Sequence, residues 1–118
     1  MSDTTTKAPG VAPRQVHDVA DLAQQNDDSI VSRTLMNTKS GSLSLFVFAE
    51  GQRLSEHTCP YDAMAHVLEG TAEIVIDGVS FGVNAGQMLL MPANVPHAVH
   101  AKQSFKMLLT MFKVKNGE

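Results

Sequence analysis

The sequence predicts an all-β domain of the sandwich or barrel type, and three features indicate it. From Ile30 onward the chain consists of short runs rich in Val, Ile, Leu, Phe and Thr. Gly, Asn, Asp and Pro separate these runs at intervals close to the roughly 8 to 12 residues typical of such folds. Asp77-Gly78 is the strongest hairpin signal, because glycine tolerates positive φ in a two-residue turn.

Nine strands follow from this pattern, in the order of the apolar runs. We expect them at residues 30–36, 43–49, 53–58, 63–69, 71–77, 79–82, 87–91, 97–101 and 105–114. Residues 16–22 are expected to form one short helical turn before the first strand. Residues 1–14 are poor in apolar side chains and are expected to form a flexible N-terminal tail, because burial cannot offset the entropy of ordering them. Residues 15–118 then form a single domain.

Length, composition and charge limit the partners of this domain. A chain of 118 residues buries about two-thirds of its unfolded surface in one core and is too short for two ordinary domains. No apolar run approaches the roughly 18 residues that span a bilayer, and the net charge of -3 with scattered basic residues predicts no nucleic-acid partner. The single cysteine cannot form an intrachain disulfide and no secretory signal pattern is present, so a cytoplasmic location is expected.

One predicted strand suggests contact with a second subunit. In residues 73–77, Val75 is apolar where a half-exposed strand would carry a polar side chain. The strand is therefore expected to be covered on both faces, and another copy of the chain is the expected second cover. The apolar runs at residues 89–91 and 107–109 favour the same interpretation, so a homodimer is expected.

Three side chains that can bind a metal occur at suggestive positions. The two-residue period of a strand places His57 and Cys59 on one face, roughly 7 Å apart along the chain. His97 follows a loop at residues 92–96, and a barrel would allow its strand to lie beside that of His57. This spacing alone is a weak signal for a metal site, far weaker than paired CxxC motifs.

The order of these residues resembles the two motifs of the small single-domain cupins of the cupin-2 type. The first motif is matched by Gly51-x5-His57-x-Cys59 with Gly70 after it, and the second by Gly86-x5-Pro92-x-Asn94-x2-His97. The resemblance extends over residues 41–112. It implies the cupin double-stranded β-helix, a jelly-roll barrel, and it implies a divalent metal inside the barrel.

The match to the metal ligands of the family is incomplete. His57 and His97 stand at ligand positions, Cys59 replaces the second histidine, and Ala63 occupies the position of the glutamate. Asp62 substitutes for that glutamate only if its strand bulges, because on a regular strand it faces the opposite way. His57, Cys59 and His97 could hold Zn, Fe, Ni or Cu, because a thiolate favours these metals. The alternative is a barrel without metal, in which Cys59 is a small buried hydrophobe.

Other candidate residues have weaker support. Tyr61, in the loop after Pro60, is a candidate proton donor, although packing is its commoner role. His66 and His100 have the outward parity of their strands and are expected at the surface. A thiol nucleophile at Cys59 with His57 as its base is disfavoured, because the two are too far apart along one strand for a hydrogen bond.

Two classes of function remain open at this level. One is metal-assisted chemistry on a small oxygen-rich molecule, such as oxygenation, isomerisation or lyase action, which the resemblance implies. The other is a metal-free module that binds or senses a small organic ligand. The motifs of serine hydrolases, P-loop proteins and dinucleotide-binding proteins do not occur in the sequence.

Overall fold

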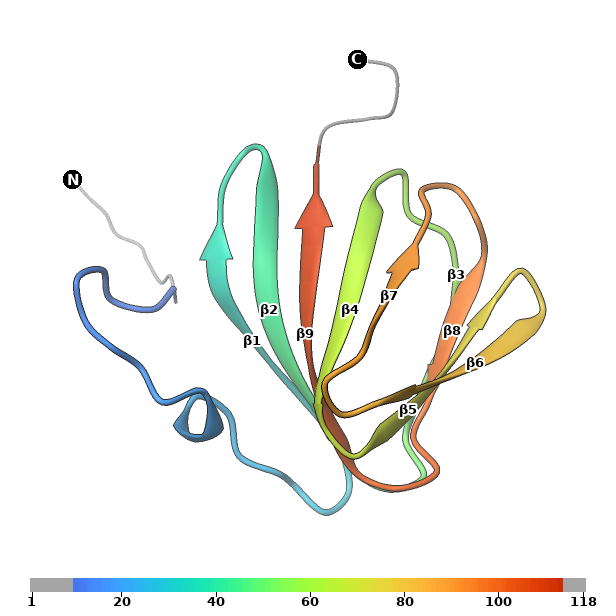
Figure 1. Ribbon diagram of the computed structural model, residues 1–118, viewed down its shortest axis with the longest axis horizontal. Coiled ribbons are helices and arrows are strands. Elements are labelled where there is room, and N and C mark those ends of the chain that lie inside the picture. The colour runs from blue at the N-terminus through green and yellow to red at the C-terminus, as the bar shows by residue number, and fades with distance from the viewer. Residues whose placement is uncertain (1–9, 114–118) are drawn as a thin grey trace.

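The computed structural model describes residues 10–113 and shows an almost entirely β structure (Figure 1). The elements are η1 (Val19–Asp21), β1 (Ile30–Asn37), β2 (Gly41–Phe48), β3 (Arg53–His57), β4 (Asp62–Glu69), β5 (Thr71–Ile76), β6 (Val79–Asn84), β7 (Met88–Met91), β8 (His97–His100) and β9 (Phe105–Phe112). Each of the nine expected strands is present within a few residues of its expected position. No helix in the described residues is long and apolar enough to cross a membrane.

The strands form two antiparallel sheets. The five-stranded sheet has the order β1-β2-β9-β4-β7 and the four-stranded sheet the order β3-β8-β5-β6. The chain passes repeatedly from one sheet to the other, so that neighbours in each sheet come from distant parts of the sequence. Figure 1 shows the strands of both sheets converging at one end of the molecule and splaying apart at the other. This arrangement confirms the predicted all-β class.

The main core lies between the two sheets. Along β4, Ala63, Ala65 and Val67 are buried and alternate with half-exposed residues, as expected for a strand with one face inward. Phe48 of β2 stacks on Phe105 of β9 with 4.5 Å between ring centroids and 13° between ring planes. The four-stranded sheet contributes six apolar side chains to the same cluster: Leu54, Ala72, Ile74, Ile76, Val83 and Val99.

A second apolar cluster lies on the outer side of the five-stranded sheet. It contains Leu35, Leu45 and Val47, and part of the N-terminal segment, including Val11 and Leu22, packs onto it. The Val11 N–H donates a hydrogen bond to the Leu35 carbonyl at 2.9 Å. Most of the predicted tail lies outside the described residues, but at Val11 the chain is docked on β1 rather than free. The expected helical turn is the short 3-10 helix η1.

Backbone conformation at the turns follows the sequence signals. Asp77 and Gly78 both have positive φ, 51° and 81°, as a tight hairpin between β5 and β6 requires. Gly70 has φ 74° where the chain leaves the five-stranded sheet for the four-stranded one. A Cβ at Gly70 would lie 2.6 Å from the Ser104 carbonyl oxygen, so both the φ value and the close packing favour glycine here.

Candidate functional site

The structure brings His57 and His97 together. His57, at the end of β3, is paired across the ladder with His97, the first residue of β8. Their imidazole rings are 4.4 Å apart between centroids and inclined at 67°, in an edge-to-face arrangement. His97 is 8% exposed, whereas His57 is exposed. One ring is thus part of the protein interior and the other is accessible from outside.

A bulge in β3 places His57 on this face. Leu54 pairs with Val99, but the next pair is His57 with His97, so three steps on β3 match two steps on β8. Leu54 packs against the core, and strict alternation would turn His57 to the opposite face. The additional residue reverses this parity and directs His57 to the side of Leu54 and His97. Bulges that redirect a side chain are frequent next to functional sites.

Both imidazoles are held by backbone carbonyl groups. Nδ1 of His57 lies 2.8 Å from the Ser55 oxygen, and Nδ1 of His97 lies 3.3 Å from the Val95 oxygen. A carbonyl oxygen only accepts hydrogen bonds, so Nδ1 carries the hydrogen in each ring. In the neutral rings, Nε2 therefore keeps its lone pair. This is the tautomer in which histidine binds metals through Nε2 while a second group orients the ring.

Burial keeps His97 neutral. It lowers the pKa of His97 below its ordinary value of 6.5, and the neighbouring His57 lowers it further. The hydrogen bond to Val95 opposes this change only in part. The unprotonated Nε2 of His97 is thus the favoured state at neutral pH.

Cys59 does not complete a three-ligand cluster with the histidines. It lies beyond the end of β3 as a half-buried free thiol. Its carbonyl oxygen accepts a hydrogen bond from Asn94 N–H at 2.7 Å, which ties the loop after β3 to the loop before β8. Asn94 has φ 66°, a value that Asn tolerates at this motif position. Within residues 10–113, no group of three or more His, Cys, Asp or Glu side chains is arranged to hold a metal ion.

The position of the family glutamate has no carboxylate. Ala63 is 4% exposed and packs in the core at this point. The pairing of β4 is regular from Asp62 to Val67, so no bulge turns Asp62 inward. Instead, Oδ1 of Asp62 accepts a hydrogen bond from Ala93 N–H at 2.8 Å and anchors the loop before β8. Asp62 is a positioning residue for the His97 loop.

The remaining sequence candidates lie away from the histidine pair or beside it in the loops. Tyr61 is half-buried immediately before β4. His66 is paired with Met88 and Leu108 on the outer side of the five-stranded sheet. His100 faces Glu73 on the outer side of the other sheet, with 3.6 Å between Nδ1 and the carboxylate. The outward orientation expected for both histidines is therefore observed.

An apolar wall continues the histidine pair across the four-stranded sheet, and the sequence analysis missed it. His97 is paired with Ile76, and Ile76 with Val79, so these side chains share one face with His57. Phe81 is paired with the core residue Ile74 and therefore faces the same way. Val79 is 57% exposed and Phe81 39%. We call Ile76, at the end of β5, and Val79 and Phe81 of β6 the β6 wall. The alternation of apolar Val79 and Phe81 around Ser80 is the signal in the sequence that could have found it.

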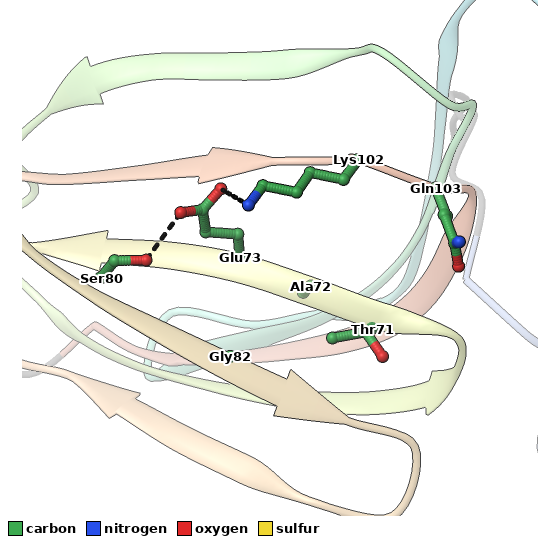
Figure 2. Close-up of a pocket in the computed structure, with 7 residues that line it drawn as sticks. All are labelled: Thr71, Ala72, Glu73, Ser80, Gly82, Lys102 and Gln103. Atoms are coloured by element: carbon green, nitrogen blue, oxygen red, sulfur yellow. Dashed lines mark hydrogen bonds and ion pairs between the residues drawn. The ribbon is translucent and has the colours of Figure 1, made fainter.

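A separate hollow lies on the opposite side of this sheet (Figure 2). Its volume is about 350 Å³, and its lining includes Glu73, Ser80 and Lys102. Glu73 accepts a hydrogen bond from Ser80 at 2.7 Å and lies 3.7 Å from the Lys102 ammonium. Because Glu73 alternates with the core residue Ile74 along β5, this hollow faces away from the histidine pair.

Comparison with known proteins identifies the family of this chain. The sequence pattern of the cupin domain family matches residues 44–112, which include both histidines. The chain belongs to the cupin family. A conserved protein of unknown function from Streptococcus pyogenes has the same fold, with a TM-score of 0.84 and 33% identity over 96% of this cupin and 99% of that chain.

Two curated relatives come from Streptomyces. The polyketide synthase CurC of Streptomyces cyaneus is 31% identical over 70 residues, 58% of this cupin and 46% of that protein. The protein SchB of Streptomyces halstedii is 33% identical over 70 residues, 58% of this cupin and 51% of that protein. The matched part of this cupin spans about half the length of each of these relatives.

The separation of the two histidine rings is compatible with a metal ion shared between them. Two imidazoles bound to one ion at about 2.1 Å, at a right angle to each other, have ring centroids roughly 4.5 Å apart. The observed separation is 4.4 Å. Imidazole is a suitable donor for Zn, Cu, Fe and Ni. Two protein ligands leave several coordination positions for water or an organic oxygen.

Proposed function

We propose that this cupin binds a small organic molecule beside the β6 wall, at a divalent transition metal held by His57 and His97. The observation that carries this proposal is the pair of imidazoles, 4.4 Å apart, with both Nδ1 atoms directed to backbone carbonyls. The two Nε2 atoms are then the metal donors. Cys59 was part of the expected ligand set, but the proposal rests on the imidazoles because Cys59 is not clustered with them.

Each part of the site has a separate task in this proposal. The carbonyls of Ser55 and Val95 fix the orientation of the rings and the position of their protons. Asp62 holds the loop before β8 and so supports the position of His97. Burial keeps His97 unprotonated. A bound divalent metal would act as a Lewis acid on a carbonyl, enolate or phenol oxygen of the ligand.

The β6 wall limits the type of ligand. Ile76, Val79 and Phe81 offer apolar surface next to two polar rings, so a molecule with one oxygen-bearing edge and one apolar face fits both. Aromatic hydroxyketones have this form. The similarity to a Streptomyces polyketide synthase supports this class, because polyketides carry ketone and hydroxyl groups on carbon skeletons of this kind.

Metal-free binding of the same type of molecule is the second candidate. It is favoured by the lack of a third clustered ligand among the described residues. In that case the Nε2 atoms of His57 and His97 accept hydrogen bonds from hydroxyl groups of the ligand. The same face of the barrel is used in both proposals, so the two differ only in their dependence on metal.

Calorimetric titration tests the role of the metal. Chelator-treated protein is titrated with Zn²⁺ and Ni²⁺, and we expect one site per chain. His57→Ala and His97→Ala should each weaken binding by at least tenfold, because each removes one of two protein ligands. The matched control is His100→Ala, on the same strand as His97 but on its outer side. Binding that is absent in the wild type, or equally strong in all variants, would exclude the metal site.

A second titration tests the ligand site. The probe is 2′-hydroxyacetophenone, added with and without saturating Zn²⁺. Affinity that requires Zn²⁺ supports the metal proposal, and affinity that persists with chelator but falls in His97→Ala supports the metal-free one. Phe81→Ser should lower the affinity for the probe in either case. Unchanged affinity in both His97→Ala and Phe81→Ser would reject this face of the barrel as the binding site.

A further inference from the structure

Gly82 occupies an unusual position in the middle of β6. A glycine inside a strand weakens the strand, and it commonly marks a bulge, a sharp bend or a place where a ligand or another backbone comes close. The pairing of β5 with β6 is regular throughout, so Gly82 forms no bulge, and its φ is not positive. Among the described residues, no heavy atom lies within 4 Å of a Cβ added to Gly82. Of these uses, the approach of a ligand is the one that its surroundings leave open.

The missing side chain of Gly82 opens the hollow on the outer side of the four-stranded sheet (Figure 2). Gly82 is paired with Glu73, so a side chain at Gly82 would project beside the Glu73 carboxylate. The volume of about 350 Å³ is at the lower end of the range for small-molecule sites. The other polar residues of the lining come from β5, β6 and the loop between β8 and β9: Thr71, Ser80, Lys102 and Gln103.

One oxygen of Glu73 is left to accept a hydrogen bond from a ligand. Oε2 accepts a hydrogen bond from the Ser80 hydroxyl at 2.7 Å. Oε1 lies 3.7 Å from Nζ of Lys102 and 3.6 Å from Nδ1 of His100, and both distances exceed the roughly 2.7 to 3.2 Å of an ordinary hydrogen bond. Figure 2 shows Lys102 extending toward this carboxylate. An acceptor and a donor therefore lie side by side without being joined.

The charges at this point favour a ligand without net charge. Lys102 would repel a cation and Glu73 would repel an anion, since the two charges are only 3.7 Å apart. A hydroxyl group avoids both repulsions, because it can donate one hydrogen bond and accept others. The two oxygens of a gauche vicinal diol are slightly closer together than this ion pair. One hydroxyl can thus donate to Oε1 of Glu73 while its neighbour accepts from Lys102.

We infer that this hollow is a second binding site of the cupin and takes a vicinal diol of a sugar or another small polyol. Glu73 and Lys102 hold the two hydroxyls, and the carbon skeleton lies over the backbone at Gly82. Because the side chains of β5 alternate between the two faces, the hollow is separated by the sheet from the histidine pair. The inference is independent of the proposed metal and its ligand.

Amide NMR titration tests the site. The probes are methyl α-D-glucopyranoside and methyl α-D-mannopyranoside, which between them present diequatorial and axial–equatorial diols. We expect saturable shifts of the Glu73, Gly82 and Lys102 amides, with dissociation constants in the millimolar range. Glycine, a small zwitterion that could bind Glu73 and Lys102 through its charges alone, should produce no such shifts.

Two variants test the assigned roles. Gly82→Val fills the hollow beside Glu73 and should abolish the sugar-dependent shifts, and valine suits a strand, so the fold should be kept. Glu73→Gln keeps the size of the side chain but removes its charge, and should lower the affinity about fivefold or more. The matched control is Arg53→Gln. It removes a charge from the row that pairs Glu73 with His100 and His100 with Arg53, but outside the lining, and should leave the affinity unchanged.

A folded Gly82→Val variant should still bind Zn²⁺ as the wild type does, because the histidine pair is on the other side of the sheet. The inference is overturned if neither sugar produces saturable shifts, or if the shifts lie around His97 instead of Gly82. It is also overturned if Gly82→Val and Glu73→Gln both bind the sugars like the wild type, or if glycine binds and the sugars do not.

Discussion

The outer sides of the two sheets differ in what covers them. On the four-stranded sheet, the outer positions of β5 and its neighbours include Glu73, Ser80 and His100, and Figure 2 shows Glu73 between Ser80 and Lys102. On the five-stranded sheet, the outer residue Leu45 is 0% exposed because the N-terminal segment packs over it. Within residues 10–113, the N-terminal segment thus adds a layer to the five-stranded sheet.

This difference bears on one expectation about the strand at residues 73–77, which was expected to have a second subunit as cover because of Val75. Within the chain, Val75 is half-buried and paired with Ser80 and Ala98 beside the polar Glu73 network. The large apolar surface is on the other sheet. One apolar residue in a strand does not show what lies on the neighbouring strands, and these neighbours decide whether a face is wet or covered.

The largest expected loss of stability is on the outer side of the five-stranded sheet, and the outer side of the four-stranded sheet is the comparison. Leu45→Ala should lower the free energy of unfolding by about 2 to 5 kcal/mol, because it opens a cavity beneath the N-terminal segment. Val75→Ala, on the outer side of the other sheet, should cost only about 1 kcal/mol. Urea unfolding of both variants measures the difference. Equal losses would show that the two outer faces are covered to the same extent.

A smaller effect is expected where the chain crosses between the sheets. Gly70→Ala should cost about 2 to 3 kcal/mol, because alanine is strained at φ 74° and its Cβ meets the Ser104 carbonyl. Gly78→Ala is the matched control: φ is 81°, but no heavy atom lies within 4 Å of the added Cβ. About 1 kcal/mol is expected there. Thermal unfolding of both variants separates the cost of backbone strain, which they share, from the cost of the clash, which only Gly70→Ala has. If Gly70→Ala loses no more stability than Gly78→Ala, the packing around Gly70 is not tight.

The smallest expected effect is the pH dependence of stability. It differs between His97, on the inner side of the four-stranded sheet, and Glu73, on its outer side. The lowered pKa of His97 means that the unfolded chain binds its proton first, so stability is intact above pH 6.5 and falls as the pH drops below it. The hydrogen bond from Ser80, aided by Lys102 and His100, lowers the pKa of Glu73, so the stability from this group is present above pH 4.5 and is lost below it.

Urea unfolding in EDTA at pH 7.5 and 5.5 tests the contribution of His97. The wild type should lose stability between these values, and His97→Asn should lose less, since asparagine can still donate to the Val95 carbonyl. Ser80→Ala should change the profile only below pH 5. A His97→Asn variant with the full acid sensitivity of the wild type would assign that sensitivity to other groups.

Much of the fold follows from local patterns in the sequence. The nine strands, the Asp77-Gly78 hairpin and the left-handed Asn94 depend on alternation and turn chemistry within a few residues. The order of residues around Gly51, His57, Gly86 and His97 further indicated the cupin family, to which the chain belongs. These features required no knowledge of which strands are neighbours.

The candidate site was only partly predictable. The sequence identified His57 and His97, but their meeting depends on the bulge between Leu54 and His57 and on the β3–β8 pairing. The two-residue period of a strand predicted that Cys59 lies on the same face as His57. However, β3 ends at His57, so this period does not apply to Cys59. The exposure of Val79 and Phe81 depends on β6 being an edge strand.

The sequence by itself determined where strands and turns form and which side chains are able to bind metal, because these properties depend on residues close together in the chain. Tertiary structure alone decided that the imidazoles lie 4.4 Å apart, that Asp62 anchors a loop, and that the N-terminal segment covers only part of one sheet. The reason is physical: alternation assigns a side chain to one of two faces, but the sheet order and register, set by contacts between distant segments, decide what that face meets.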